Sequence, residues 1–226
     1  DIDKRNFTIV DVDGDGHKLQ QYNRLLFCDS KKRIWAGGEM GISVFNQVGT
    51  SLLPNTDFQI ASVLKQAFVN CFYETSSGYL WIGTRNGLFA LKESDKQFLQ
   101  YTTENGLPSN VIYGILEDAY GRLWISTNQG LSCLNSESGK FRNFTIMDGL
   151  QGNQFNAGAY CRKDNGYMLF GGVNGITSFR PETLIDNPYA PKPVINKLFV
   201  HNKEVLPDDE TGILKESITY VNRITL

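Results

Sequence analysis

The chain has 226 residues, a formal net charge of −2 and a charged fraction of 20%. This balance excludes a chain-wide basic surface of the kind that binds nucleic acid or an anionic membrane. No segment approaches the ~18 consecutive apolar residues of a membrane span, and the first residues do not look like a signal peptide. We therefore expect a piece of a longer protein. Because glycine and aromatic residues are abundant, we expect it to be rich in short strands and tight turns.

The first motif along the chain is an acidic run at residues 11–16, Asp-Val-Asp-Gly-Asp-Gly. Asp11, Asp13 and Asp15, with the glycine that follows, match the first half of an EF-hand calcium loop. That loop needs a bidentate glutamate at its twelfth position, where this chain has Tyr22. The run therefore predicts an acidic turn, and calcium binding is the weaker alternative.

A nine-residue pattern then recurs at residues 33–41, 79–87, 122–130 and 167–175. Each copy has a large apolar anchor six positions before a turn glycine, and an apolar residue follows the glycine. The four anchors are Trp35, Trp81, Trp124 and Leu169. Their spacings of 46, 43 and 45 residues indicate a repeat architecture.

Each repeat is predicted to form four short antiparallel strands. In the third repeat we expect them at residues 111–116, 122–127, 131–134 and around 140–144. Four strands in about 45 residues are typical of a β-propeller blade. The predicted fold class is therefore all-β, with four blades that form part of a larger propeller. Because the anchors recur at one position in every blade, we expect them to pack between blades and not to stack on a sugar.

The repeat ends after Pro181, and three prolines follow within a short stretch. We expect blades over residues 1–186, a proline-rich linker over 187–193 and a second β domain over 194–226, because the segment after the linker alternates in a strand-like way.

The four cysteines include no closely spaced pair that would indicate zinc. They are Cys28, Cys71, Cys133 and Cys161. In the repeat alignment Cys133 and Cys161 fall where other blades have apolar or small residues, which predicts buried core positions. Disulfides are the alternative in an oxidising compartment. We expect free buried thiols, because these positions belong to different blades.

Nothing in the sequence points to catalysis. Glu74, Glu117 and Asp118 lie in predicted turns, and glycoside hydrolysis would need two carboxylates to converge; solvated turns are the simpler interpretation. His17 and His201 share no pattern with nucleophiles or carboxylates. No phosphate-binding glycine motif is present, so we expect no catalytic residue and no cofactor.

A ligand site is expected where polar turns gather. In a four-stranded meander, the turn between the second and third strands and the loop that joins two blades emerge on one face. The candidate ligand-binding residues on that face are Arg85, Asn86, Asn128, Gln129, Asn174 and Asn110. Amide and guanidinium groups suit hydroxyl-rich ligands. The alternative is that asparagine occurs there because it tolerates left-handed turn conformations.

Several motifs resemble one known family. Residues 80–88, Leu-Trp-Ile-Gly-Thr-Arg-Asn-Gly-Leu, and residues 121–131 resemble the two-component regulator propeller repeat. Residues 105–110 are similar to its connecting loop, and residues 155–159 and 170–179 look like its last blade. The stretch at 193–202 resembles the opening of the three-tyrosine β-sandwich that follows such propellers. Two departures are Ser126 at the usual motif glycine and Leu169 at the usual tryptophan.

The resemblance implies the periplasmic sensor region of a hybrid two-component receptor, an inner-membrane protein with a histidine kinase. Residues 194–226 would then be the truncated first strands of an Ig-like β-sandwich. It implies an oligosaccharide ligand, contacts with further blades and with the sandwich, and a homodimer in the full receptor. Membrane attachment would come only through a transmembrane helix outside this chain, and this fragment would bind no nucleic acid.

Two other functions are weighed against the sensor. A secreted propeller enzyme acting on polysaccharide, a glycosidase or a lyase, is the main alternative. An interaction propeller of the WD40 kind is disfavoured, because its Gly-His and Trp-Asp dipeptides are absent.

Overall fold

The chain divides into two compact units, Asp1–Leu184 and Ile185–Leu226. The computed structural model describes residues 23–49, 51–55, 64, 66–92, 97–184, 194–221 and 223–224. The acidic run at 11–16 and the predicted linker at 187–193 lie outside these residues. In the part of the chain that is described, no helix is long and apolar enough to cross a membrane.

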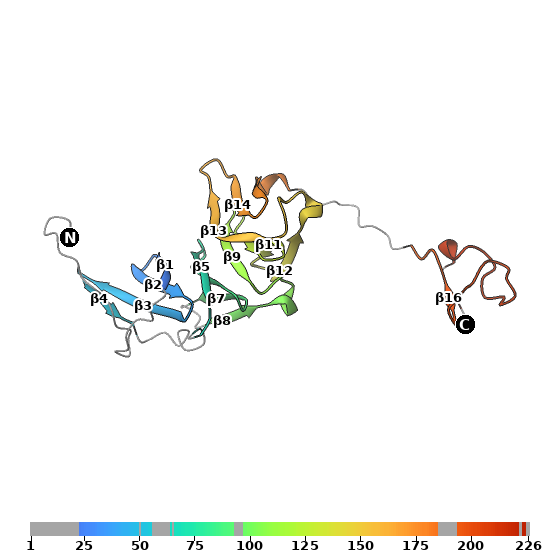
Figure 1. The fold of residues 1–226 in the computed structure, drawn as a ribbon, viewed down its shortest axis with the longest axis horizontal. Coiled ribbons are helices and arrows are strands. Elements are labelled where there is room, and N and C mark those ends of the chain that lie inside the picture. Colours follow the sequence, from blue (N-terminus) through green and yellow to red (C-terminus); the bar gives the residue numbers. More distant parts are fainter. Residues whose placement is uncertain are drawn as a thin grey trace. The chain divides into compact units, whose positions relative to one another are not determined.

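The first unit consists of four antiparallel sheets, each following chain order (Figure 1). Blade 1 contains β1 (Asn23–Cys28), β2 (Arg33–Gly38), β3 (Gly41–Val48) and β4 (Ser51–Pro54). Blade 2 contains β5 (Val69–Glu74), β6 (Leu80–Thr84), β7 (Leu88–Lys92) and β8 (Gln97–Tyr101). Blade 3 contains β9 (Ile112–Glu117), β10 (Leu123–Thr127), β11 (Gly130–Asn135) and β12 (Lys140–Phe144). Blade 4 contains β13 (Phe155–Arg162), β14 (Met168–Gly172) and β15 (Gly175–Phe179).

The all-β blade architecture predicted from the sequence is confirmed, and the strands of the third repeat lie within a residue or two of their predicted bounds. The fourth sheet has three strands among the described residues. Short 3₁₀ helices follow the last strands of blades 2, 3 and 4. They are η2 (Thr103–Asn105), η3 (Ile146–Asp148) and η4 (Pro181–Thr183).

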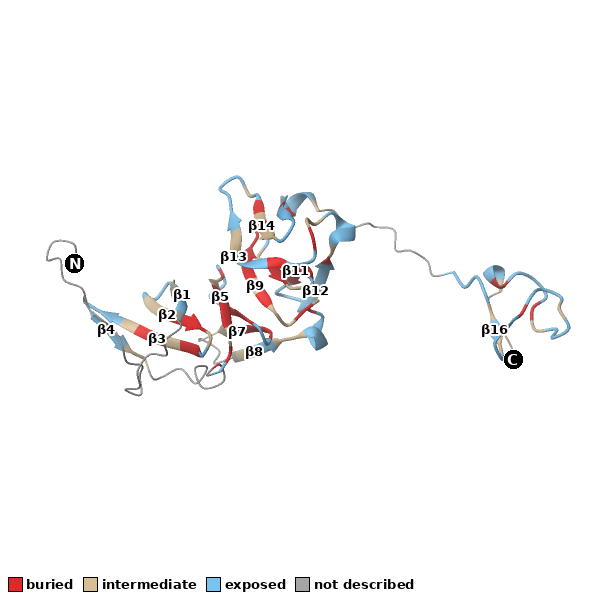
Figure 2. Cartoon of the chain, viewed as in Figure 1, coloured by how far each residue is buried: buried red, intermediate tan, exposed pale blue. Residues whose placement is uncertain are grey.

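Burial follows the position of a strand within its blade. Every residue of β6 and of β10 is buried, because both faces of these sheets pack against neighbouring blades. The outer strands β4 and β12 are mostly exposed or half-buried (Figure 2). The core is therefore a series of layers between blades, as in other repeat architectures.

Each layer contains one of the predicted tryptophan anchors. Trp35 of blade 1 lies 6.3 Å from the ring of Phe72 in blade 2. Trp81 packs in a buried cluster with residues of blades 2 and 3, and Trp124 of blade 3 lies 4.7 Å from the ring of Phe179 in blade 4. The prediction that the anchors pack between blades is confirmed for the three tryptophans; the fourth anchor, Leu169, is only half-buried and lies outside the described core clusters.

The position two residues after each anchor must be small. A Cβ on Gly83 would overlap Cys71 Sγ and lie 2.7 Å from the Ile112 side chain of the next blade. Blade 3 has Ser126 here, paired across the strands with Gly114. The ring of Tyr160 from blade 4 lies directly against Gly114, where a Cβ would overlap it. In blade 3 the small residue required for close packing is therefore Gly114 on the neighbouring strand, and this leaves room for Ser126 at the usual glycine position.

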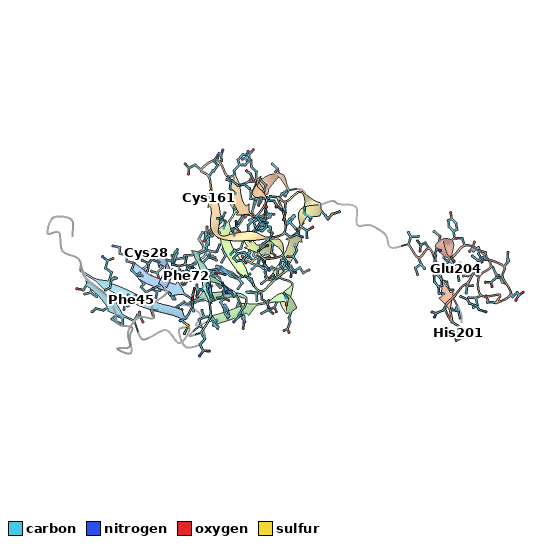
Figure 3. The ribbon with its side chains drawn as sticks, in the orientation of Figure 1. Cys28, Phe45, Phe72, Cys161, His201 and Glu204 are labelled. Carbon is cyan, nitrogen blue, oxygen red and sulfur yellow. The ribbon has the colours of Figure 1, made fainter. Side chains whose placement is uncertain are left out.

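All four cysteines are free, as predicted, but two of them are exposed. Cys71 and Cys133 are buried, and burial raises the pKa of the Cys71 thiol to about 12. The prediction of a buried Cys161 is wrong. Cys161 lies on β13, on the opposite side of the strand from Tyr160, which faces blade 3, and Cys28 is likewise exposed on β1 (Figure 3).

The second unit is small. It contains a hairpin of β16 (Phe199–Val200) and β17 (Lys203–Glu204) and the 3₁₀ helix η5 (Ile218–Tyr220). His201 and Asn202 form the hairpin turn with φ values of 50° and 62°, as a two-residue hairpin turn requires. A cluster of three buried residues lies beneath it: Val205, Leu214 and Ile218. The hairpin is the only sheet among the described residues of this unit, and an Ig-like sandwich over 194–226 remains a prediction.

Candidate ligand-binding face

The turns after the second strands lie beside the loops that join the blades. Backbone hydrogen bonds run from the turn glycines to the entrance of the next blade: Gly41 N to Ala67 O at 3.0 Å and Gly87 N to Asn110 O at 2.8 Å. In blade 3 the corresponding bond runs from Gly130 N to Asn153 O at 2.6 Å. The two kinds of loop therefore share one face of the first unit, as the strand order predicted. We call this the loop face.

The joining loops of blades 2 and 3 have the same internal structure. Thr102 and Thr145 cap the 3₁₀ helices η2 and η3, and the helices end in Gly106 and Gly149 with positive φ. Asn110 Oδ1 accepts a hydrogen bond of 2.8 Å from the backbone N–H of Thr103. The side chain of Asn110 therefore holds its own loop. Asn110 does not have a positive φ, so the left-handed-turn alternative does not apply to it.

Asn153 confirms that this role recurs. Its Oδ1 accepts an equivalent bond of 2.8 Å from Ile146 N. An asparagine four residues after the glycine that ends the 3₁₀ helix is thus a feature of loop architecture, and the spacing in the sequence could have shown it.

The other candidate residues lie on the turns of the same face. Asn86 and Gln129 are exposed, and their backbone N–H groups donate to Thr84 Oγ1 and Thr127 Oγ1 at 2.9 and 3.0 Å. Asn128 is half-buried beside the entrance of its own blade. Asn174 is also exposed, and its backbone N–H donates to Gln151 Oε1 at 2.8 Å. Hydrogen bonds thus place these residues on one face, where their role in binding remains a prediction.

Arg85 differs from these residues because it is paired with an aromatic ring. Its guanidinium carbon lies 3.6 Å from the centroid of Phe68, and Arg85 N donates to Phe68 O at 3.0 Å. Arg24, from the start of β1, has its guanidinium carbon 5.9 Å from the same ring. Sequence reasoning missed Phe68 and Arg24. Phe68 precedes the first strand of blade 2, outside the repeated pattern, and only the folded chain brings the three residues together.

Acidic residues occupy the opposite ends of the blades, and here the solvated turns predicted from the sequence are wrong. Asp118 and Glu117 are buried. Asp118 Oδ2 accepts from Trp124 Nε1 at 3.0 Å and from Arg122 Nε at 2.7 Å. Asp29 makes the same contacts with Arg33 and Trp35 in blade 1. We call this set of contacts the anchor clamp.

Blade 2 lacks the clamp acid. Thr75 stands at the equivalent position, and the buried Trp81 Nε1 has no hydrogen-bond partner among the residues that the structure describes. The pKa of Asp29 reflects its clamp. Burial raises it, but hydrogen bonds from the Trp35 indole and from the backbone and guanidinium of Arg33 outweigh burial and leave the pKa lowered.

The two glutamates connect consecutive blades. Glu74 accepts hydrogen bonds of 2.7 Å from both the backbone N–H and the hydroxyl of Ser30. Glu117 accepts the same pair from Ser76, each at 2.9 Å. In blade 4 the equivalent residue is Arg162, whose guanidinium donates to the Glu117 carbonyl at 2.8 Å. Each carboxylate therefore has a structural partner in the preceding blade.

These contacts account for the acids that a hydrolase would need. Glu74 and Glu117 each bind a different serine, and Asp118 is enclosed by its clamp. No three His, Cys, Asp or Glu side chains among the described residues are grouped to hold a metal ion. The weak calcium candidates Asp11, Asp13 and Asp15 lie outside those residues. The arrangement is suited to binding on the loop face and to rigid blade packing at the other end.

Comparisons with known proteins agree with this architecture. Residues 64–86 and 106–129 match the family described as two component regulator propeller. These segments contain the anchors of blades 2 and 3 and the end of the loop that joins the two blades. Histidine kinase P4 of Formosa agariphila is 30% identical over 209 residues, covering 90% of this chain and 15% of that protein.

Two solved structures from B. thetaiotaomicron have similar folds. The extracellular domain of the hybrid two component system BT3049 has a TM-score of 0.71 at 24% identity, covering 89% of this chain and 28% of that chain. The extracellular domain of the one component system BT4673 has a TM-score of 0.54 at 24% identity, with coverages of 70% and 23%. This chain therefore spans only a small part of the proteins it resembles. Two of its segments are similar to two-component regulator propeller repeats, and its first unit folds as consecutive β-propeller blades.

Proposed function

We propose that this chain is a ligand-sensing part of a hybrid two-component receptor, located in the periplasm and connected to a histidine kinase. The observation that carries the proposal is the match of blades 2 and 3 to the two-component regulator propeller family. The similarity to a histidine kinase over 90% of the chain supports it.

The ligand proposed is an oligosaccharide bound at the loop face. Exposed amides at Asn86, Gln129 and Asn174 offer both donors and acceptors, which sugar hydroxyls require. Binding there would change the arrangement of blades and of the domain that follows, and a homodimer of receptors would transmit the change to the kinase. The remaining blades and the sandwich of the receptor are the structural partners in this proposal.

The fragment itself makes and breaks no bond in this account. The carboxylates at the other end of the blades support that view, because their oxygens are engaged by serine, tryptophan and arginine donors. A secreted polysaccharide lyase or glycosidase remains the competing function, and a glycosidase would need two carboxylates that converge on the substrate.

Calorimetric titration of the chain against neutral and acidic plant, host and microbial oligosaccharides tests the proposal. Sugar release is followed in the same samples. Saturable binding of one class with no release is the expected result. Release of product from any saccharide would contradict the proposal and favour the enzyme.

A further inference from the structure

Two arginines and one phenylalanine form a cationic cluster on the loop face. Phe68 belongs to the connection between blades 1 and 2, Arg24 is the second residue of β1, and Arg85 lies in the turn between β6 and β7. The guanidinium carbons lie 5.9 and 3.6 Å from the ring centroid. Three separate segments thus place two positive charges around one half-buried ring.

The ring holds Arg85 in a defined position. A guanidinium that stacks on an aromatic face is attracted by the ring quadrupole and keeps its edge N–H groups available. The backbone of the same residue is fixed as well, because Arg85 N donates to Phe68 O at 3.0 Å. Arg85 is nevertheless exposed. Less side-chain freedom is therefore lost when its edge binds a ligand.

Arg24 adds a second donor that is only weakly engaged. Its Nη1 lies 3.5 Å from Glu39 Oε1, and the side chains of Arg24 and Glu39 are 62% and 39% exposed. Exposed ion pairs of this length contribute little in water. An incoming anion can therefore replace Glu39 as the partner of Arg24. Even with Glu39 counted, the two arginines leave a net positive charge on the cluster.

We infer that the Arg24–Phe68–Arg85 cluster binds the carboxylate or sulfate group of an acidic oligosaccharide. A planar guanidinium matches both anions with two parallel hydrogen bonds, which a neutral sugar cannot accept with comparable strength. The exposed Asn86, next to Arg85, supplies an amide for the neighbouring hydroxyls. This inference rests on the proposed sensing function and names the chemical class of its ligand.

The test is calorimetry of the full chain with three probes of matched length: an oligogalacturonate, a sulfated chondroitin oligosaccharide and a neutral galactan oligosaccharide. The first two distinguish carboxylate from sulfate recognition. We expect at least one acidic probe to bind, and its affinity to fall as salt is raised. Arg85→Gln and Arg24→Gln are each expected to weaken that binding about 10- to 100-fold, as for loss of a charge-assisted hydrogen bond.

A matched control is available in blade 3. The guanidinium carbon of Arg142 lies 4.7 Å from the ring of Phe144, so Arg142→Gln removes a similar exposed arginine elsewhere. This variant should change affinity less than twofold. Unchanged unfolding midpoints of all three variants exclude a general loss of structure. Arg85→Lys, which keeps the charge without the planar edge, should bind more weakly than the wild type and more tightly than Arg85→Gln.

Two results would overturn the inference. Equal or tighter binding of the neutral probe would overturn it, and so would acidic-probe binding that the two arginine variants leave unchanged. Either result leaves the sensor proposal standing. Hydrolysis or elimination of a probe would instead overturn the proposed function.

Discussion

The anchor clamp in blade 3 makes a quantitative prediction about stability. Asp118 has a fully buried side chain and accepts hydrogen bonds from Trp124 Nε1, Arg122 Nε and the backbone N–H groups of Tyr120 and Arg122, at 2.7–3.0 Å. Asp118→Ala leaves the Trp124 N–H unpaired in the core, which costs about 1–3 kcal/mol. The side chain of Arg122 is 29% exposed, so its guanidinium can recover part of its hydration. The loss is therefore below that of a fully buried pair, and we expect a total of about 3–4 kcal/mol.

Urea unfolding followed by tryptophan fluorescence measures this effect, because the chain has three tryptophans and all of them are blade anchors. Thr75→Ala is the matched control. It changes the equivalent residue of blade 2, where Trp81 Nε1 has no partner to lose among the described residues. Thr75→Ala removes the hydroxyl contacts of Thr75 with Ser77 and with the backbone of Tyr79, for which we expect a loss of about 1–2 kcal/mol. Asp118→Asn, which keeps the shape and one acceptor oxygen, should cost about half as much as the alanine variant. The reasoning is refuted if Asp118→Ala costs no more than Thr75→Ala.

Three further outcomes are expected. Folding lowers the pKa of Asp29, so the ionised carboxylate stabilises the fold fully above the unfolded-chain pKa of 3.8, and this stabilisation is lost as pH falls toward the lower pKa of the folded chain. The difference in unfolding free energy between wild type and Asp29→Asn should therefore shrink over that pH range. Ser126→Ala should raise stability by about 1 kcal/mol in urea unfolding, because the buried Ser126 hydroxyl has no partner. Ser132→Ala should lower it, because Ser132 Oγ donates to Asn143 Oδ1 at 2.7 Å; equal effects of the two variants would contradict this. A thiol reagent should label the two exposed cysteines of the native chain and reach the two buried ones only after unfolding.

The repeat pattern predicted the blades well because the physical demand is the same in each copy. An anchor such as Trp35 must fill the space between two sheets, and a glycine such as Gly87 must adopt a positive φ of 123° at the turn. Both demands are local and recur with the period, so they can be read from spacing alone. The same reasoning located the loop face, since antiparallel strand order alone decides which loops share an end.

Contacts between different blades could not be predicted in this way. The Glu74–Ser30 contact recurs as Glu117–Ser76 at the same distances from the anchors, but spacing alone does not show that a glutamate of one blade meets a serine of the preceding one. Arg85 contacts Phe68, which lies outside the repeated pattern. The exposure of Cys161 depends on which side of blade 4 is covered, and the repeat alignment does not contain that information. The spacing of the repeat placed Asp118 in a turn, but its burial follows from the contacts that Trp124 and Arg122 make with its carboxylate.

The kinase activity of the complete receptor tests the central claim most directly. The receptor would be reconstituted in vesicles, and autophosphorylation would be measured while the oligosaccharide that binds this chain is titrated from outside. The account predicts a saturable change in the phosphorylation rate at the concentrations where calorimetry shows binding, and its loss in the Arg85→Gln receptor if the ligand is acidic. A rate that stays constant at saturating ligand would contradict the account.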